Sequence, residues 1–61
     1  MSEPLAQEKR QEIFFKLVEE QDLGTSVELS RQRVSERFGI SVPELLAIEQ
    51  QGRLRQWPPL S

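Results

Sequence analysis

The chain has 61 residues, a formal net charge of −2, and neither cysteine nor histidine. A chain this short is one domain, residues 1–61, and folding buries only ~60% of the surface that its unfolded form exposes. Missing cysteines exclude disulfides and thiolate metal sites, and missing histidines exclude the commonest metal ligand and general base. No apolar run approaches the ~18 residues of a membrane span, and the N-terminus lacks signal-peptide features, so we expect a cytoplasmic protein without a membrane partner.

The first predicted helix covers residues 4–22. Its entrance is Ser2-Glu3-Pro4, because proline is tolerated in the first helical turn. Gly24 can adopt the left-handed conformation that ends a helix, which places a break after this segment. An apolar stripe at helical spacing is formed by Ile13, Phe14, Leu17 and Val18.

The second predicted helix covers residues 30–38, and two starts compete for it. A capping box can begin at Thr25, whereas Ser30 as the cap creates a hydrophobic staple that ends at Val34. We favour Ser30, because Val34 and Phe38 then face inward one turn apart.

The third predicted helix covers residues 42–51. Ser41 and Glu44 have the spacing of a capping box, and Gly52 lies just past the expected end. Pro58 and Pro59 favour an extended tail over residues 53–61. We expect Trp57 to fold back against the core near Phe15, and the alternative is a docking peptide for an aromatic groove.

The stretch from Arg31 to Ile48 has the spacing of a helix-turn-helix motif. Two steeply angled helices need a tight turn, which Gly39 supplies, and a small residue where they approach, which is Ser35. Apolar residues flank the glycine and recur on the second helix: Val34, Phe38, Ile40, Leu45 and Ile48. The predicted fold class is therefore all-α, a small three-helix bundle that contains a helix-turn-helix and ends in an extended Trp-Pro-Pro tail.

Residues 31–54 also resemble the DNA-binding head of the MerR-like regulators. The resemblance lies in G-[IV]-S-V-x-x-L at residues 39–45, followed by Glu49, Gly52 and Leu54. It implies that the helix after the turn enters the major groove of DNA and that the protein acts in transcription regulation. The sequence departs from the family at residues 46–48, where the family usually has an arginine followed by two aromatic residues.

The charge distribution supports a DNA-binding hypothesis. Residues 1–29 hold three basic and seven acidic residues, a net −4, whereas residues 30–61 hold five basic and three acidic residues, a net +2. Arginine suits phosphate because its planar guanidinium donates two hydrogen bonds at once. The predicted phosphate contacts are Arg31, Arg33, Arg37, Arg53 and Arg55, and the predicted base contacts are Gln50 and Gln51. A module this small is expected to bind double-stranded DNA as a homodimer.

A protein-interaction module that keeps the helix-turn-helix shape is the alternative hypothesis. The face of the third helix opposite the core is mostly apolar, which suits a protein partner better than base edges. The alternative interface is formed by Val42, Pro43, Leu46, Ala47, Phe15 and Trp57. We expect no enzyme, metal or cofactor, because the serines have no histidine or cysteine partner and the glycines form no phosphate-binding loop.

Overall fold

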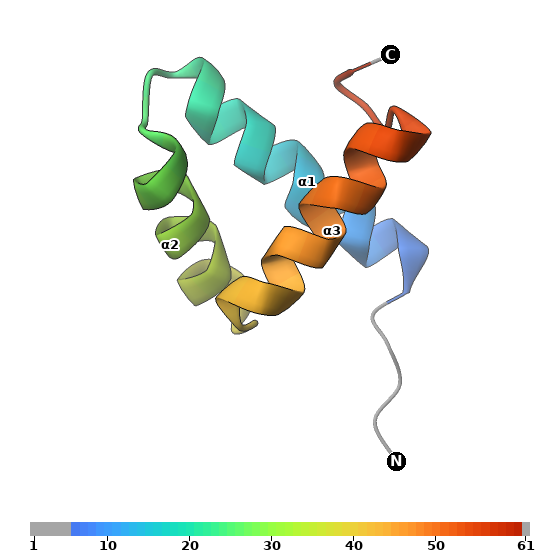
Figure 1. Ribbon diagram of the computed structural model, residues 1–61, viewed down its shortest axis with the longest axis horizontal. Coiled ribbons are helices and arrows are strands. Elements are labelled where there is room, and N and C mark those ends of the chain that lie inside the picture. Colours follow the sequence, from blue (N-terminus) through green and yellow to red (C-terminus); the bar gives the residue numbers. More distant parts are fainter. Residues whose placement is uncertain (1–5, 61) are drawn as a thin grey trace.

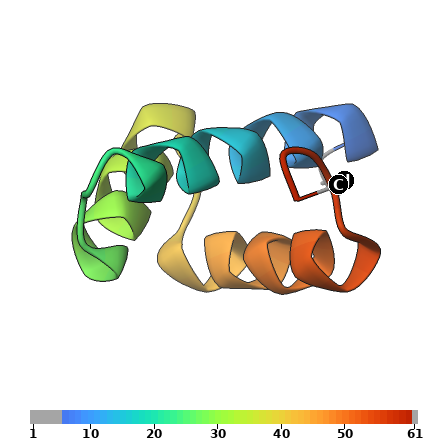
Figure 2. The ribbon, with the colours of Figure 1, turned by 90° about the horizontal axis from the view of Figure 1, so that it is seen from above.

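The computed structural model describes residues 6–60, which form three helices and no strand. Helix α1 covers Gln7–Asp22, α2 covers Val27–Phe38 and α3 covers Val42–Arg55. Helices α1 and α3 lie in two layers, and α2 closes one end of the bundle (Figure 1 and Figure 2). Each helix contacts the other two, so the prediction of a small all-α three-helix bundle is confirmed.

The core lies where the inner faces of the three helices meet. Seven apolar side chains are at most 4% exposed: Ile13, Phe14, Leu17, Val34, Leu45, Ile48 and Trp57. The stripe predicted for the first helix is confirmed, because three of its members are in this core and Val18 packs against it. Phe38 and Ile40 are half-buried at the end of the core where α2 meets α3.

The start of α1 differs from the prediction. Ala6 has an extended conformation and precedes the first helical residue, Gln7, so the predicted start at residue 4 is too early. The proposed entrance, Ser2-Glu3-Pro4, lies outside the described residues. The predicted end at Asp22 is confirmed, and Gly24 takes a positive φ of 96° in the turn that follows.

Helix α2 begins three residues before the predicted start. Ser26 is its N-cap, and the Ser26 hydroxyl accepts a hydrogen bond from the Leu29 N–H at 3.2 Å. Ser30 is instead a buried helical residue, which donates to the Val27 carbonyl and accepts from Gln21 Nε2 on α1. The choice of Ser30 as the cap is therefore wrong, because its hydroxyl is used to hold α2 against α1.

Helix α3 begins as predicted but ends four residues later. The Ser41 hydroxyl accepts from the Glu44 N–H at 3.2 Å, which confirms Ser41 as the N-cap. Gly52, expected beyond the helix, is buried within it because α3 passes directly over the Phe14 ring of α1 there. Gln56, with a φ of 54°, is the residue that ends the helix in the left-handed conformation.

The prediction that residues 53–61 form an extended tail is also wrong for residues 53–60, the part that the structure describes. Residues 53–55 belong to α3, and the Leu60 N–H donates to the Trp57 carbonyl at 2.9 Å, which closes a turn. Trp57 folds back into the core as predicted, but it packs on Phe14 rather than Phe15. The two rings meet edge to face, with centroids 6.1 Å apart and an interplanar angle of 77°.

Candidate functional site: the outer face of α3

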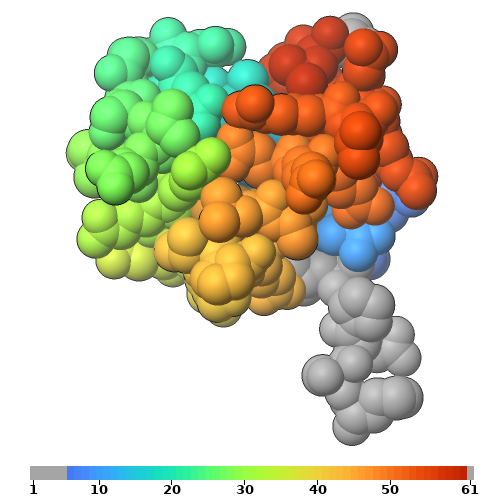
Figure 3. All heavy atoms as spheres, viewed as in Figure 1, coloured from blue at the N-terminus to red at the C-terminus, as the bar shows by residue number. Residues whose placement is uncertain are grey.

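The connection between α2 and α3 fixes how α3 is presented. Residues 39–41 join the two helices, and Gly39 ends α2 in the left-handed conformation with a φ of 67°. Ser41 then starts α3 through its side-chain cap, and Pro43 is accommodated in the first turn. The turn places α3 across one side of the molecule, where neither of the other helices covers its outward surface (Figure 3).

Helix α3 is divided between a buried and an exposed side. The side toward the core carries Leu45, Ile48, Glu49 and Gly52, all buried. Helical periodicity places Pro43, Ala47, Gln50 and Leu54 on the opposite side, with Val42 and Leu46 beside them. These six exposed residues form what we call the outer face of α3.

The outer face of α3 is mostly apolar. Leu54 is 79% exposed, Val42 43% and Leu46 40%. An open hollow of about 300 Å³ lies between successive turns of this face, lined by Ala47, Gln50, Gln51, Leu54 and Arg55. Exposed apolar side chains such as Val42, Leu46 and Leu54 on one helix face are typical of a surface that meets another protein.

A buried carboxylate lies beside this face. Glu49, 4% exposed, accepts a hydrogen bond from Arg31 Nε of α2 at 3.0 Å and from Arg53 Nη2 one turn later on α3 at 2.8 Å. Each carboxylate oxygen therefore holds one arginine. The two arginines, Glu49, Leu46 and Gln50 line a second hollow, of about 310 Å³.

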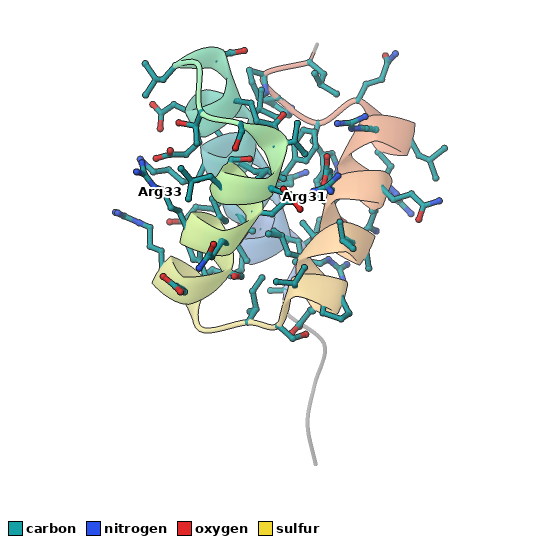
Figure 4. All side chains as sticks on the ribbon, turned by 60° about the vertical axis from the view of Figure 1, so that its left-hand side comes forward. Arg31 and Arg33 are labelled. Carbon is teal, nitrogen blue, oxygen red and sulfur yellow. The ribbon has the colours of Figure 1, made fainter. Side chains whose placement is uncertain are left out.

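The five arginines predicted to contact phosphate do not form one surface. Arg31 points toward α3, whereas Arg33 points away from it on the other side of α2 (Figure 4). Arg33 and Arg37 line a hollow with Lys16 and Glu20 of α1, and Arg33 lies 3.7 Å from the Glu20 carboxylate. The last turn of α3 carries Arg53 and Arg55.

The residues predicted to contact bases lie on α3, next to apolar neighbours. Gln50 is exposed on the outer face, and Gln51 is half-buried at its edge. Both line the hollow that contains Leu54. On this side the two amides share their surface with Ala47, Leu54 and Arg55, and Gln50 also borders the hollow that contains Arg31 and Arg53.

The residues of the alternative interface divide into three groups. Val42, Pro43, Leu46 and Ala47 come together on the outer face of α3. Phe15 is 46% exposed, but it lies on α1. Trp57 is buried, so its assignment to a contact face is wrong, because the ring completes the core against Phe14.

Sequence reasoning misses two residues of this site. Leu54 falls in the predicted tail because the helix is expected to end at Gln51, although positions 47, 50 and 54 continue one helical face. Glu49 belongs to the motif that begins at Gly39, but its partner Arg31 lies 18 positions away in the chain. Extending the predicted third helix by one turn would have placed Leu54 on the same face as Ala47 and Gln50. The pairing of Glu49 with Arg31, in contrast, depends on the packing of α2 against α3.

Within residues 6–60, no three acidic side chains lie together as a metal site. None of the three described helices is long and apolar enough to cross a membrane. Comparisons with family models, curated proteins and solved structures gave no match to the chain.

The pairing of Glu49 predicts a loss of stability on its neutralisation. Glu49→Gln puts an amide N–H against one of two arginines that now meet carboxylate oxygens. We expect the free energy of unfolding to fall by about 1.5–3 kcal/mol, the range for hydrogen bonds to charged groups. Urea denaturation followed by circular dichroism measures the change.

Glu36→Gln is the matched control for this variant, because Glu36 is an exposed glutamate of α2. We expect its free energy of unfolding to stay within ~0.5 kcal/mol of the wild type. Equal stabilities for the two variants would show that the Glu49 contacts contribute nothing measurable to the fold.

Proposed function

We propose that this chain is a protein-interaction module that keeps a helix-turn-helix arrangement and binds its partner through the outer face of α3. The observation that carries the proposal is the exposure of Val42, Leu46 and Leu54 on one side of a single helix. Apolar side chains at base edges have little to contact except thymine methyl groups, whereas they contribute fully to a desolvated protein interface.

The helix-turn-helix part of the proposal rests on the connection and on the pattern of burial. Residues 39–41 join α2 to α3, and Gly39 takes the left-handed conformation at the turn. Val34 and Ser35 are buried on α2, and Leu45 and Ile48 are buried on α3. This arrangement leaves one whole side of α3 available to a partner.

The local charges also favour a protein partner over DNA. Glu49 already occupies Arg31 and Arg53, which removes part of the hydrogen-bonding capacity that phosphate would use. Glu44, exposed in the first turn of α3, would repel phosphate at the end of the helix that enters the groove in helix-turn-helix docking. Both features are compatible with a partner that is itself a folded protein.

Photo-crosslinking tests the proposed surface. A photoreactive residue at Ala47, on the outer face of α3, is expected to form a covalent protein adduct in an extract of cells that express the chain. The matched control carries the same group at Gln32, an exposed residue of α2. Excess unlabelled chain should suppress an Ala47 adduct with a different protein, whereas it should increase an adduct that has the mass of two copies of the chain. An unlabelled Leu54→Glu chain should do neither.

Equal adducts from the two positions, or no adduct from Ala47, would contradict the proposed function. The mass of the adduct also separates a second copy of the chain from a different protein.

Double-stranded DNA binding is the second candidate function, and the exposed arginines favour it. Within residues 6–60, Arg37 and Arg55 take part in no ion pair, and Arg33 is 59% exposed. In this alternative α2 lies against the DNA backbone and the arginines supply affinity through phosphate. It predicts that Arg33→Glu weakens binding to any duplex, because phosphate contacts are independent of base sequence.

A further inference from the structure

The spacing of the residues along the outer face of α3 is the same when it is counted from either end of the helix. Its central line consists of Pro43, Ala47, Gln50 and Leu54, at intervals of four, three and four residues. When two copies of such a helix run in opposite directions, Pro43 lies opposite the partner's Leu54 and Ala47 opposite the partner's Gln50. A two-fold symmetric interface requires a surface that is complementary to itself in this way.

The charges along α3 select the antiparallel direction. The first turn of the helix carries Glu44, and the last turn carries Arg53 and Arg55. Helical periodicity places Glu44 and Arg55 on the same flank of the outer face, at its two ends. Antiparallel packing brings each Glu44 near the partner's Arg55, whereas parallel packing brings like charges to the same level.

We propose that the outer face of α3 binds the same face of a second copy of the chain, with the two α3 helices antiparallel. This inference rests on the proposed function and names its partner. Leu54 at each end packs beside Pro43 of the other copy, and the hollow lined by Ala47, Gln50, Gln51 and Leu54 receives side chains from the facing helix. The two Glu44–Arg55 contacts fix direction and register.

The interface is small, which sets the conditions of the test. Fourteen residues of α3 give a helix about 21 Å long, so the contact area lies at the low end for protein interfaces. Such a dimer dissociates on dilution. We therefore expect the average mass of the chain to rise with concentration between about 1 µM and about 1 mM.

Sedimentation equilibrium of the full chain over this range, at low salt, tests the inference. The wild type should show a monomer–dimer equilibrium, and Leu54→Glu should remain monomeric. Glu44→Arg and Arg55→Glu should each weaken self-association roughly tenfold, because each replaces two attractions with two repulsions. Glu36→Arg, a reversal of an exposed charge on α2, is the matched control and should leave the dimer unchanged.

Mixing the two charge variants gives the sharpest result. One Glu44→Arg chain and one Arg55→Glu chain restore opposite charges at both contacts, so the mixture should form heterodimers nearly as well as the wild type dimerises. This recovery also shows that both variants are folded. A wild type that stays monomeric throughout, or a dimer that is insensitive to Leu54→Glu and to the charge reversals, would overturn the inference.

The two proposals fail in different ways. A monomeric wild type that still forms an Ala47-specific adduct with another protein overturns only the identity of the partner. The absence of any Ala47-specific adduct, together with a monomeric wild type, overturns the proposed function itself.

Discussion

Trp57→Ala is expected to unfold most of the protein at 25 °C. The indole is 4% exposed and packs edge to face on Phe14 at the junction of α1 and α3. Truncating a buried aromatic side chain to alanine costs about 3–5 kcal/mol, and the whole stability of a domain this small is about 3–5 kcal/mol. Circular dichroism at the helical minimum should show the loss without relying on tryptophan fluorescence.

Leu60→Ala is the control for this prediction, because Leu60 belongs to the same turn but is 50% exposed. We expect it to change the free energy of unfolding by less than ~1 kcal/mol. A Trp57→Ala protein that unfolds at the same urea concentration as the Leu60→Ala protein would show that the tail does not complete the core.

Gly52→Ala is expected to destabilise the protein, although alanine is the better helix former. Helix propensity alone would stabilise the variant by about 1 kcal/mol. A Cβ at this position would lie 2.6 Å from both Cγ and Cε1 of Phe14, so the ring or the helix must move. Overpacking of this kind costs about 1–3 kcal/mol, and we expect this cost to exceed the gain in helix propensity. Urea denaturation measures the sign.

A double variant separates overpacking from any other effect of Gly52. Phe14→Leu replaces the ring that a Cβ would meet. In that background Gly52→Ala should cost less than it does in the wild type, because the two positions are in contact and their effects are not additive. The same cost in both backgrounds would exclude the Phe14 contact as the cause.

The parts of the fold that depend on local pattern could be predicted from the sequence. The apolar stripe that contains Ile13, Phe14 and Leu17 is a matter of helical spacing, and all three side chains are buried. Ser41 is followed by Glu44 at the spacing of a capped helix, and its hydroxyl does cap α3. In both cases the residues that decide the structure lie within one or two turns of each other.

The errors arise where a tertiary contact overrides the local pattern. Gly52 has the position of a helix terminator, yet the helix continues because the glycine allows close approach to Phe14. Ser30 has the side chain of a cap, yet its partners are Val27 and Gln21. A single sequence does not show which helix packs against which glycine or serine.

The candidate site could be predicted only in part for the same reason. Helical periodicity predicts that Val42, Pro43, Leu46 and Ala47 share one face, and the structure exposes all four on α3. The pairing of Glu49 with Arg31 and Arg53 joins two helices and required the structure. That pairing changes the interpretation of the arginines, since two of the five predicted phosphate contacts share one carboxylate.

The most direct test of the proposed function is a titration of labelled duplex DNA with the chain, read by fluorescence anisotropy at about 50 and about 200 mM salt. If the outer face of α3 binds protein, we expect no saturable binding at the higher salt and no difference between the wild type and Arg33→Glu. Binding that weakens by about one log unit per log unit of salt for each phosphate contacted would contradict the proposal, provided that Arg33→Glu weakens this binding and Leu54→Glu does not.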